Sequence, residues 1–430
     1  MSGKKNGNHY NLKALCCGKD LEDDGRILGC PECRDPHLLR ASYKKKQLKT
    51  GAMEEGLYRF SDWLPIQREL KGSSAPVSYK SEGLAKALGM NNLWITFNGW
   101  WPEKGASMKT GTFKECEAYA VCARIPENTE DVLVVASAGN TARAFMRVCS
   151  ENNIPLVVCV PEDNLNSLWS DAPGADCIKV IACASGSDYF DAIALSNKLC
   201  EGAGFYPEGG AKNPARRDGM GTTVLSAAIE IGKIPEFYFQ AVGSGTGAIA
   251  AWEAALRLEE DGNFGRNKMK LMVSQNVPFQ IIHDSWKADS RTLLGLDNNE
   301  ARQQSQIINA KVLSNRKPPY SLPNGLYDAL KASGGDVLLA DNEEAEKAAL
   351  LFEQSEGNDI SPAAAVAVAS LIKALESRQV HKNALVMLNI TGGGMGRYQK
   401  EHTTAPTVAD LVFSTDQEVS DVIEQVQKLF

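Results

Sequence analysis

The chain has 430 residues with 46 basic and 53 acidic side chains, which gives a formal net charge of −7. This length exceeds one simple core and predicts about two domains. The slight acidity gives no electrostatic reason to expect a nucleic acid or an anionic membrane as a partner. No run of about 18 apolar residues predicts a membrane span. The N-terminal residues carry no apolar signal core, so we expect a cytoplasmic protein.

The eleven cysteines are an odd number and are scattered along the chain. Most stand singly inside apolar segments, such as Cys159 in PLVVCVPE and Cys177 in GADCIKV. This pattern favours free thiols in a reducing compartment over a framework of disulfides.

The first 50 residues are polar, contain cysteines and then become basic. The motif CPEC (Cys30–Cys33) has the spacing of half a zinc ribbon, and a complete ribbon needs a second such pair upstream. Only the adjacent Cys16 and Cys17 precede it, and two neighbouring cysteines suit one metal ion poorly. We therefore predict a head at residues 1–50 that holds no metal. The alternative is a metal site formed by Cys17, Cys30 and Cys33 with Cys16, His9 or His37.

From about residue 53 onward, short apolar runs alternate with segments of helical periodicity. Strands are predicted at 91–97, 131–137, 154–162, 177–184, 236–243, 268–276, 336–342 and 384–391. Helices are predicted at 112–125, 140–153, 188–204, 222–232, 248–261, 342–357 and 361–378. Continuous apolar strands between helices indicate an α/β protein with parallel sheets covered on both faces. The alternation is too interrupted for a single eightfold barrel.

A glycine-rich turn, GSGTG, stands between a predicted strand and the helix that starts at residue 248. Gly243, Gly245 and Gly247 would let the backbone approach an anion, and the hydroxyls of Ser244 and Thr246 add donors. Backbone N–H groups and the positive end of the following helix would stabilise a phosphate there. The turn is neither a Walker loop nor G-x-G-x-x-G, and a plain tight turn is the alternative.

Two further polar corners follow apolar strands. Ser137, Gly139, Asn140 and Thr141 belong to the turn SAGNT at a helix start, where a capping turn is the simpler interpretation. Thr391 stands at the C-terminal end of a late strand, where α/β sheets place ligands. A flexible turn is the alternative there.

The segment KGASMKTGTFKECEA contains three lysines, of which Lys114 stands between Phe113 and a predicted helix. Burial would lower the pKa of that amine and favour the neutral form that attacks a carbonyl. Lys104 and Lys109 lie in a polar loop and are candidates for contact with an anion. One cofactor with a phosphate, a polar ring and an aldehyde would use all four corners. We therefore expect pyridoxal 5′-phosphate.

The order of these motifs resembles the fold type II pyridoxal-phosphate enzymes, and within them the threonine synthase family. GTFKE resembles the lysine motif of that family, SAGNTA its asparagine loop and AKNPARRDGMGTT its Asn-Pro-x-Arg segment. ISPAAAVAVASL resembles its Pro-Ala-rich helix, TGGGMG its terminal Thr-Gly, and CPEC the zinc-ribbon-like head of archaeal members. YRFSDWLP and FNGWWPEKGASMKTGTFKECEA resemble the cysteate synthase branch, because threonine synthases usually carry an Asn-Pro-Thr-Gly-Ser turn before the lysine.

The resemblance implies the tryptophan synthase β-like fold, with two parallel-sheet α/β domains and a small head at 1–50. The larger domain, expected to bind the phosphate of the cofactor, would comprise residues 51–95 and 222–430. The smaller domain, expected to carry the lysine and the asparagine loop, would comprise residues 96–221.

The resemblance also implies roles for individual residues. Lys114 would form the Schiff base and exchange the Cα proton, Asn140 would bond the ring hydroxyl, and Thr391 would face the pyridine nitrogen. The Gly243–Gly247 loop would hold the phosphate, and the Ser137–Thr141 corner the substrate carboxylate. The candidates for contact with the anionic substrates are Lys104, Lys109, Arg143, Arg216 and Arg217, with Lys109 and Arg143 ranked first.

The implied activity is the replacement of phosphate in O-phospho-L-serine by sulfite, which yields L-cysteate for coenzyme M synthesis. Threonine synthase activity on O-phospho-L-homoserine is one alternative, and another nucleophile acting on phosphoserine is a second. A non-catalytic protein with the same fold is a third, which the intact lysine disfavours. The expected partners are small molecules and further copies of the chain, as a dimer or trimer, with no nucleic acid and no membrane.

Overall fold

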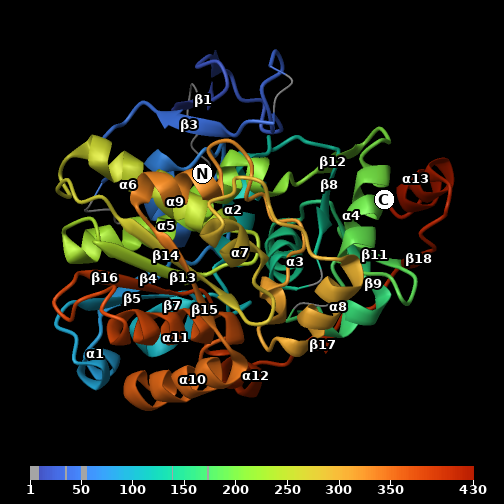
Figure 1. Ribbon diagram of the computed structural model, residues 1–430. Coiled ribbons are helices and arrows are strands. Elements are labelled where there is room, and N and C mark those ends of the chain that lie inside the picture. Colours follow the sequence, from blue (N-terminus) through green and yellow to red (C-terminus); the bar gives the residue numbers. More distant parts are fainter. Residues whose placement is uncertain (1–8, 34–35, 50–55, 138, 172–173) are drawn as a thin grey trace.

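The computed structural model describes residues 9–430, apart from 34–35, 50–55, 138 and 172–173. Figure 1 shows a small head above a body that contains two sheets lying side by side. The expected boundary between head and body, at residues 50–51, lies outside the described residues. Among the helices that are described, none combines the length and the apolar character needed to cross a bilayer.

The larger sheet has the strand order β15-β14-β13-β16-β5-β4. Its strands are β4 (Val77–Lys80), β5 (Leu93–Phe97), β13 (Phe237–Ala241), β14 (Lys270–Asn276), β15 (Asp336–Ala340) and β16 (Val386–Ile390). All neighbours are parallel except β4, which runs antiparallel to β5 at the edge. Every residue of the central strands β13 and β16 is buried, as expected for a sheet covered on both faces.

The smaller sheet has the order β12-β8-β9-β11-β18 and is parallel throughout. Its strands are β8 (Val132–Ala136), β9 (Leu156–Pro161), β11 (Ile178–Cys183), β12 (Phe205–Pro207) and β18 (Leu411–Phe413). The last strand comes from the end of the chain and is followed by α13 (Val419–Gln427). This segment therefore pairs with the smaller sheet, although the boundaries expected from the sequence placed all of 222–430 in the larger domain. A three-residue strand is too short to be recognised from its pattern.

Helices cover both sheets, and α2, α3, α4, α5, α6, α10 and α11 overlap the predicted ones. They are α1 (Gly83–Leu88), α2 (Lys114–Arg124), α3 (Asn140–Asn152), α4 (Tyr189–Leu199), α5 (Pro214–Ile231), α6 (Thr246–Asp261), α7 (Ile281–Lys287), α8 (Asn298–Ile307), α9 (Leu326–Ser333), α10 (Asn342–Glu356), α11 (Pro362–Glu376) and α12 (Met395–Glu401). Between β14 and β15, where the sequence predicted no element, lie α7, α8 and α9. These three are short, and only one residue of α8 is buried, which weakens the apolar period.

Helix α5 begins earlier than predicted because two glycines obscure its helical pattern. A Cβ added to Gly219 would lie 2.3 Å from the carbonyl oxygen of Cys116 in α2. A Cβ added to Gly221 would lie 3.2 Å from the carbonyl oxygen of Ala250 in α6. The glycines weaken the helix by propensity, yet they allow α5 to pack closely between its two neighbours.

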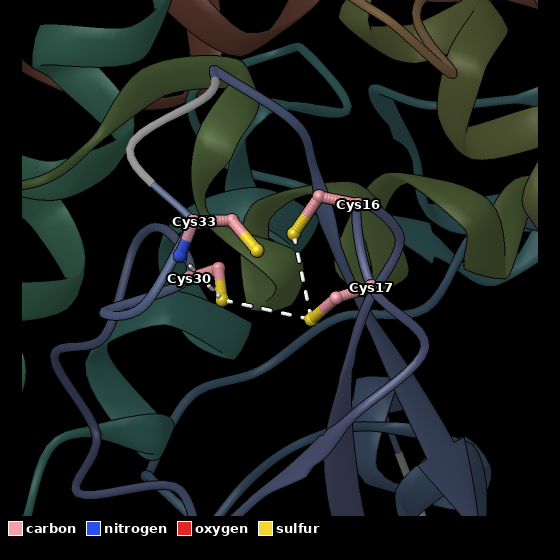
Figure 2. A group of neighbouring side chains, drawn as sticks. All are labelled: Cys16, Cys17, Cys30 and Cys33. Atoms are coloured by element: carbon pink, nitrogen blue, oxygen red, sulfur yellow. Dashed lines mark hydrogen bonds between the residues drawn. The ribbon is translucent and has the colours of Figure 1, made fainter.

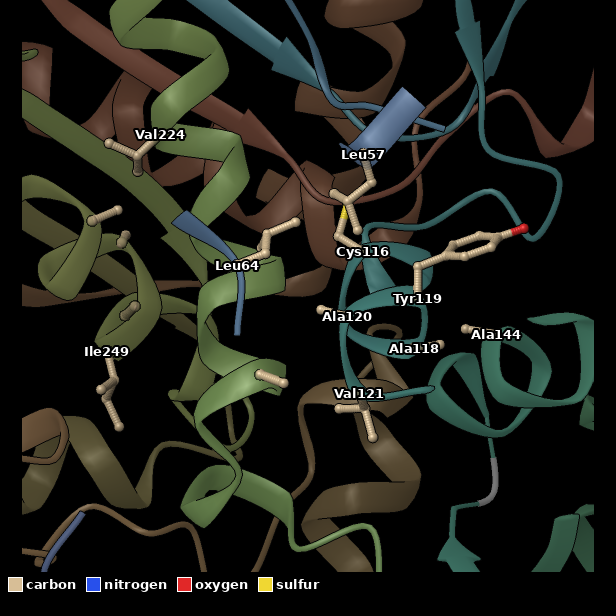
Figure 3. Packing of buried hydrophobic residues seen from close by; sticks show 14 of the residues in the cluster. Leu57, Leu64, Cys116, Ala118, Tyr119, Ala120, Val121, Ala144, Val224 and Ile249 are labelled. Atoms are coloured by element: carbon tan, nitrogen blue, oxygen red, sulfur yellow. The ribbon is translucent and has the colours of Figure 1, made fainter. Parts of the chain in front are cut away.

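Helix α2 lies at the centre of the core. Figure 3 shows Ala118 of α2 beside Ala144 of α3. On its other side α2 meets α5, where a Cβ added to Gly219 would lie 2.8 Å from that of Ala120. Nearly all of α2 is buried, including the charged side chains of Glu115, Glu117 and Arg124. The sequence predicted one apolar side, whereas the structure encloses the whole helix. The lysine at its first position is therefore held on a rigid element.

The head is a three-stranded antiparallel sheet, in the order β2-β1-β3. Its strands are β1 (Tyr10–Ala14), β2 (Asp20–Leu21) and β3 (Leu39–Tyr43). Arg217 of α5 fastens the head to the body, because its buried guanidinium donates to the carbonyl oxygens of Leu39 and Ala211 and pairs with Glu253 at 2.8 Å. Each of its three nitrogens thus has a partner within the protein, which favours a structural role for Arg217 over contact with an anionic substrate.

Candidate functional site

Lys114 is the first residue of α2, and its side chain is 18% exposed. Its Nζ lies 3.0 Å from Oε2 of Glu117 and 3.9 Å from the sulfur of Met220. The ring centroid of Phe113 is 4.9 Å from the same nitrogen. Phe113 and Met220 pack with Ala250, so α2, α5 and α6 meet beside the amine.

Burial lowers the pKa of the Lys114 amine, as the sequence suggested. The carboxylate of Glu117 acts in the opposite direction, while the positive charge of Arg216 lowers the pKa further. Because the neutral form of the amine is the nucleophile, this environment suits attack on a carbonyl better than a surface position would.

Glu117 connects Lys114 to its surroundings and was not identified from the sequence. Its fully buried carboxylate accepts a hydrogen bond from Oγ1 of Thr141 at 2.9 Å and pairs with Arg216 at 3.2 Å. Arg216 also pairs with Glu208 at 2.6 Å. The available signal was spacing, because a residue three positions after Lys114 lies on the same helix face.

The start of α3 carries a second cation, Arg143, in a different environment. Its guanidinium donates to Oδ1 of Asn140 and, at 2.8 Å, to the carbonyl oxygen of Ser167. It also lies 5.3 Å from the ring centroid of Trp169. Among the described residues no carboxylate is within ion-pair distance of it, and burial lowers the pKa of Arg143 to about 10. The hydrogen-bond partners of its guanidinium are therefore neutral oxygens, and no described carboxylate nearby offsets its positive charge.

Thr391 is buried at the C-terminal end of β16, directly beside the lysine corner. Its carbonyl oxygen accepts a hydrogen bond from the backbone N–H of Phe113 at 3.0 Å. The next residues form an antiparallel bridge between Thr112 and Gly392. Two segments far apart in the sequence are thus joined immediately before Lys114.

The Gly243–Gly247 loop connects β13 to α6 and is closely packed. A Cβ on Gly243 would lie 2.8 Å from the carbonyl oxygen of Val312. Gly245 has φ of +78°, and a Cβ there would lie 2.5 Å from Leu326. Larger residues would therefore displace this loop, and Gly245 also adopts a backbone conformation that favours glycine.

The start of α6 carries no side-chain cap, because its N-cap residue is Gly245. The hydroxyls of Ser244 and Thr246 lie 2.9 Å apart at this start. Backbone N–H groups and two hydroxyls at the positive end of a 16-residue helix form a fitting cradle for a phosphate. The residues present thus suit a cofactor with a phosphate at this loop and a carbonyl at Lys114.

One residue, Val312, lies against both the glycine loop and the asparagine corner. Besides its contact at Gly243, its Cγ1 would lie 3.8 Å from a Cβ on Gly139. Val312 belongs to the 3-10 turn η5 (Lys311–Leu313). The two corners predicted to bind one ligand are therefore brought close together by the fold. Ser137, at the same corner, accepts a hydrogen bond from the N–H of Gly139 at 3.3 Å.

The two loop lysines have different surroundings. The Nζ of Lys104 lies 4.1 Å from the ring centroid of Tyr79, so this charge is directed to an aromatic face. Lys109 is partly exposed near Asp171. Burial works to raise the pKa of Asp171, but the hydrogen bond from Tyr398 and the charges of Arg147 and Lys109 lower it overall.

Residues 79–392 match a family model described as pyridoxal-phosphate dependent enzyme. Among curated relatives, a protein named cysteate synthase from Methanocorpusculum labreanum is 47% identical, over 92% of this chain and 95% of that one. Another cysteate synthase, from Methanosarcina acetivorans, is 45% identical over 92% and 94%.

Solved structures with the same fold include serine racemases and a threonine deaminase. Maize serine racemase superposes with a TM-score of 0.57 at 15% identity, over 75% of this chain and 90% of that one. A threonine deaminase isoform from Solanum lycopersicum gives 0.53 at 17% identity, over 76% and 87%. These likenesses confirm the predicted fold type II architecture.

Proposed function

Since this chain belongs to the cysteate synthase family of pyridoxal-phosphate-dependent enzymes, we propose that it converts O-phospho-L-serine and sulfite into L-cysteate and phosphate. Two features of the site carry the proposal. Lys114 is a buried lysine of lowered pKa, and Arg143 is a cation with no ion-pair partner among the described carboxylates. The first suits pyridoxal-phosphate chemistry, and the second suits substrates that are anions. L-Cysteate would then serve coenzyme M synthesis.

The cofactor would be held by residues that lie around the lysine corner. Lys114 would bind its aldehyde carbon, Asn140 its ring hydroxyl and the Gly243–Gly247 loop its phosphate, with the Thr391 hydroxyl near the ring nitrogen. When bound, pyridoxal phosphate withdraws electrons from the Cα of an amino acid, which makes loss of the Cα proton and of a leaving group on Cβ feasible. A hydroxyl in place of a carboxylate at the ring nitrogen favours elimination over transamination.

Lys114 would move the proton at both ends of the reaction. Its Nζ would take the proton from Cα of the substrate. Phosphate leaves from Cβ with the bonding electron pair, and the lone pair of the sulfite sulfur forms the new bond to the same carbon. Lys114 then returns the proton to Cα. Glu117, whose Oε2 lies 3.0 Å from this nitrogen, would orient the amine.

Arg143 would receive the anionic groups of the two substrates. Phosphate and sulfite both carry negative charge, and a pocket of low dielectric constant disfavours them unless a cation is present. A guanidinium whose other partners are neutral oxygens can take up a bidentate contact without losing an ion pair. Lys109 would add positive charge from the loop, and the corner of Ser137, Gly139 and Thr141 would bind the substrate carboxylate.

The proposal is tested with the purified protein and added cofactor. We expect phosphate release and L-cysteate, measured by mass spectrometry, from phosphoserine with sulfite. Sulfide in place of sulfite tests whether another nucleophile is preferred. Efficient formation of threonine from O-phospho-L-homoserine, without cysteate from phosphoserine, would identify a threonine synthase instead.

A lysine variant provides the matching control. Lys114→Ala should lower turnover by about 10⁴-fold and abolish the borohydride-stable link between protein and cofactor, because the amine is the attacking group. Lys104→Ala should retain both, since that amine lies over an aromatic ring. A fully active Lys114→Ala protein would contradict the assignment.

We further expect a cytoplasmic homo-oligomer, a dimer or trimer. Light scattering of the purified protein measures the mass directly, and a mass equal to that of one chain contradicts this expectation.

A further inference from the structure

The head brings four cysteines together from two separate turns. Figure 2 shows Cys16, Cys17, Cys30 and Cys33 with their sulfur atoms directed toward a common centre. All four sulfurs lie within 4.8 Å of one another. The Sγ atoms of Cys16 and Cys17 are 3.8 Å apart, and those of Cys17 and Cys30 are 3.9 Å apart.

These separations match a shared metal ion and not a disulfide. A disulfide holds its sulfurs about 2.05 Å apart. Four thiolates at about 2.3 Å from a tetrahedral zinc ion stand about 3.8 Å from one another. We propose that Cys16, Cys17, Cys30 and Cys33 bind one structural zinc ion. This proposal takes up the alternative that the sequence left open, with Cys16 as the fourth ligand, in place of a metal-free head.

The backbone explains how two adjacent cysteines can serve one ion. Cys16 and Cys17 lie in the turn between β1 and β2, which closes at Gly18, where φ is +76°. The N–H of Gly18 donates to the carbonyl oxygen of Ala14 at 2.8 Å. Within this tight turn both side chains reach the same side, so the objection raised by their adjacency does not hold.

The second turn supplies a hydrogen bond of the kind that supports a thiolate. The backbone N–H of Cys33 donates to Sγ of Cys30 at 3.4 Å. An ion pair between Lys19 and Glu32 joins this turn to the first one. Because that pair is about half exposed, it contributes little to stability and would not by itself hold the turns together.

The ligand set narrows the choice of metal. Four thiolates select zinc or iron–sulfur chemistry. An iron–sulfur cluster places several iron atoms between its cysteines and spreads the sulfurs further apart than they are here. Over the described residues, no other group of three or more His, Cys, Asp or Glu side chains comes together in this way. A single zinc ion with no open position fits the four sulfurs.

The zinc ion would hold a loop that braces the catalytic helices. Between the two cysteine turns, Asp23 forms a fully buried ion pair with Arg124 at 2.7 Å. Arg124, the last residue of α2, also donates to the carbonyl oxygen of Ile27 at 2.8 Å and to Oδ1 of Asn213 at 3.1 Å. Asn213 is the N-cap of α5, whose first turn carries Arg216. The loop thus contacts the end of the lysine helix and the start of the arginine helix.

Metal analysis of the holoenzyme, purified without chelator or metal-affinity resin, tests the site. We expect about one zinc per chain and an X-ray absorption spectrum with four sulfur neighbours at about 2.3 Å. Cys30→Ser and Cys17→Ser should each lower the zinc content at least about tenfold. Cys200→Ser, a partly buried cysteine outside the cluster, is the control and should retain full zinc.

A measurement on the unmodified protein covers the case in which a cysteine variant does not fold. A strong chelator should remove the zinc, expose four thiols to a thiol reagent and lower the melting temperature by several degrees, and added zinc should reverse all three changes. The proposal is overturned by a reduced protein that binds no zinc, by a Cys30→Ser variant that retains it, or by iron on these four sulfurs.

Discussion

Two arginines near the lysine corner, Arg216 and Arg143, are both largely enclosed but differ in their partners. Arg216 pairs with the buried carboxylates of Glu117 and Glu208. Arg143 donates to an amide oxygen and a carbonyl oxygen, and no described carboxylate pairs with it. A charge that is already neutralised inside the protein stabilises the site, whereas one held by neutral oxygens remains available to an anion. Proximity to the lysine alone would not have separated these two roles.

The largest expected effect is the loss of stability in Arg216→Met. This change leaves Glu117 and Glu208 buried without their shared cation, and we expect the free energy of unfolding to fall by about 3–5 kcal/mol. Urea denaturation measures it. Arg302→Met, which removes an exposed pair with Asp188, should cost less than about 1 kcal/mol. Similar losses in both variants would remove the distinction drawn for Arg216.

The complementary change, Arg143→Met, should affect substrates more than stability. We expect kcat/KM for phosphoserine to fall about 10²–10³-fold, equivalent to about 3–4 kcal/mol, because a charge-assisted contact to an oxyanion is lost. Steady-state kinetics with Arg143→Lys as the conservative variant should show partial recovery. Normal kinetics together with a destabilised protein would make Arg143 a structural residue like Arg216.

The same contrast applies to two buried carboxylates of α2. Glu117 has two cationic partners, whereas Glu115 accepts from the N–H and the hydroxyl of Thr110, at 2.5 and 2.9 Å. Burial raises the pKa of Glu115 from 4.5 to about 7, although the charge of Arg147 opposes this. The native state therefore binds more protons than the unfolded state across this interval, and stability falls as pH rises through it.

Glu115→Gln should make the free energy of unfolding depend less on pH. Unfolding free energies of the unmodified protein between pH 4.5 and 7 should decline by at most about 3 kcal/mol from this group, and the variant should lack this decline. Denaturation curves recorded across the interval measure the slope. An unchanged slope in Glu115→Gln would assign the pH dependence to another group.

The smallest expected effect is on the lysine itself. Glu117→Gln removes the carboxylate that raises the pKa of Lys114, so the pKa should fall and a larger fraction of the amine should be neutral at a given pH. The rate at which the apo-protein binds pyridoxal phosphate covalently should therefore reach its midpoint at a lower pH. Glu208→Gln, whose contribution to the same pKa is smaller, should shift it less. A midpoint at higher pH in Glu117→Gln would contradict the predicted fall in the pKa of Lys114.

Local pattern in the sequence predicted most of the elements and the candidate corners. Apolar strands that alternate with helices indicated parallel sheets, because the strands of such sheets are joined by helices and are buried on both faces. Lys114 stood out because an apolar neighbour and a helix start are visible within a few residues. The short strand β18 and the polar helix α8 were not found, since neither carries a sustained apolar period.

The sequence by itself determined which residue types stand at strand ends and helix starts, and hence the fold class, the cofactor and the lysine that we propose to bind it. Only the tertiary structure decided which charges neutralise one another. Glu117 meets Thr141 and Arg216, Arg217 meets Glu253, and the cysteines of two turns meet in the head. Coulomb energies and metal coordination depend on distances of a few ångströms between atoms that are far apart along the chain. A local pattern holds no information about such distances, which exist only once the helices and turns have packed.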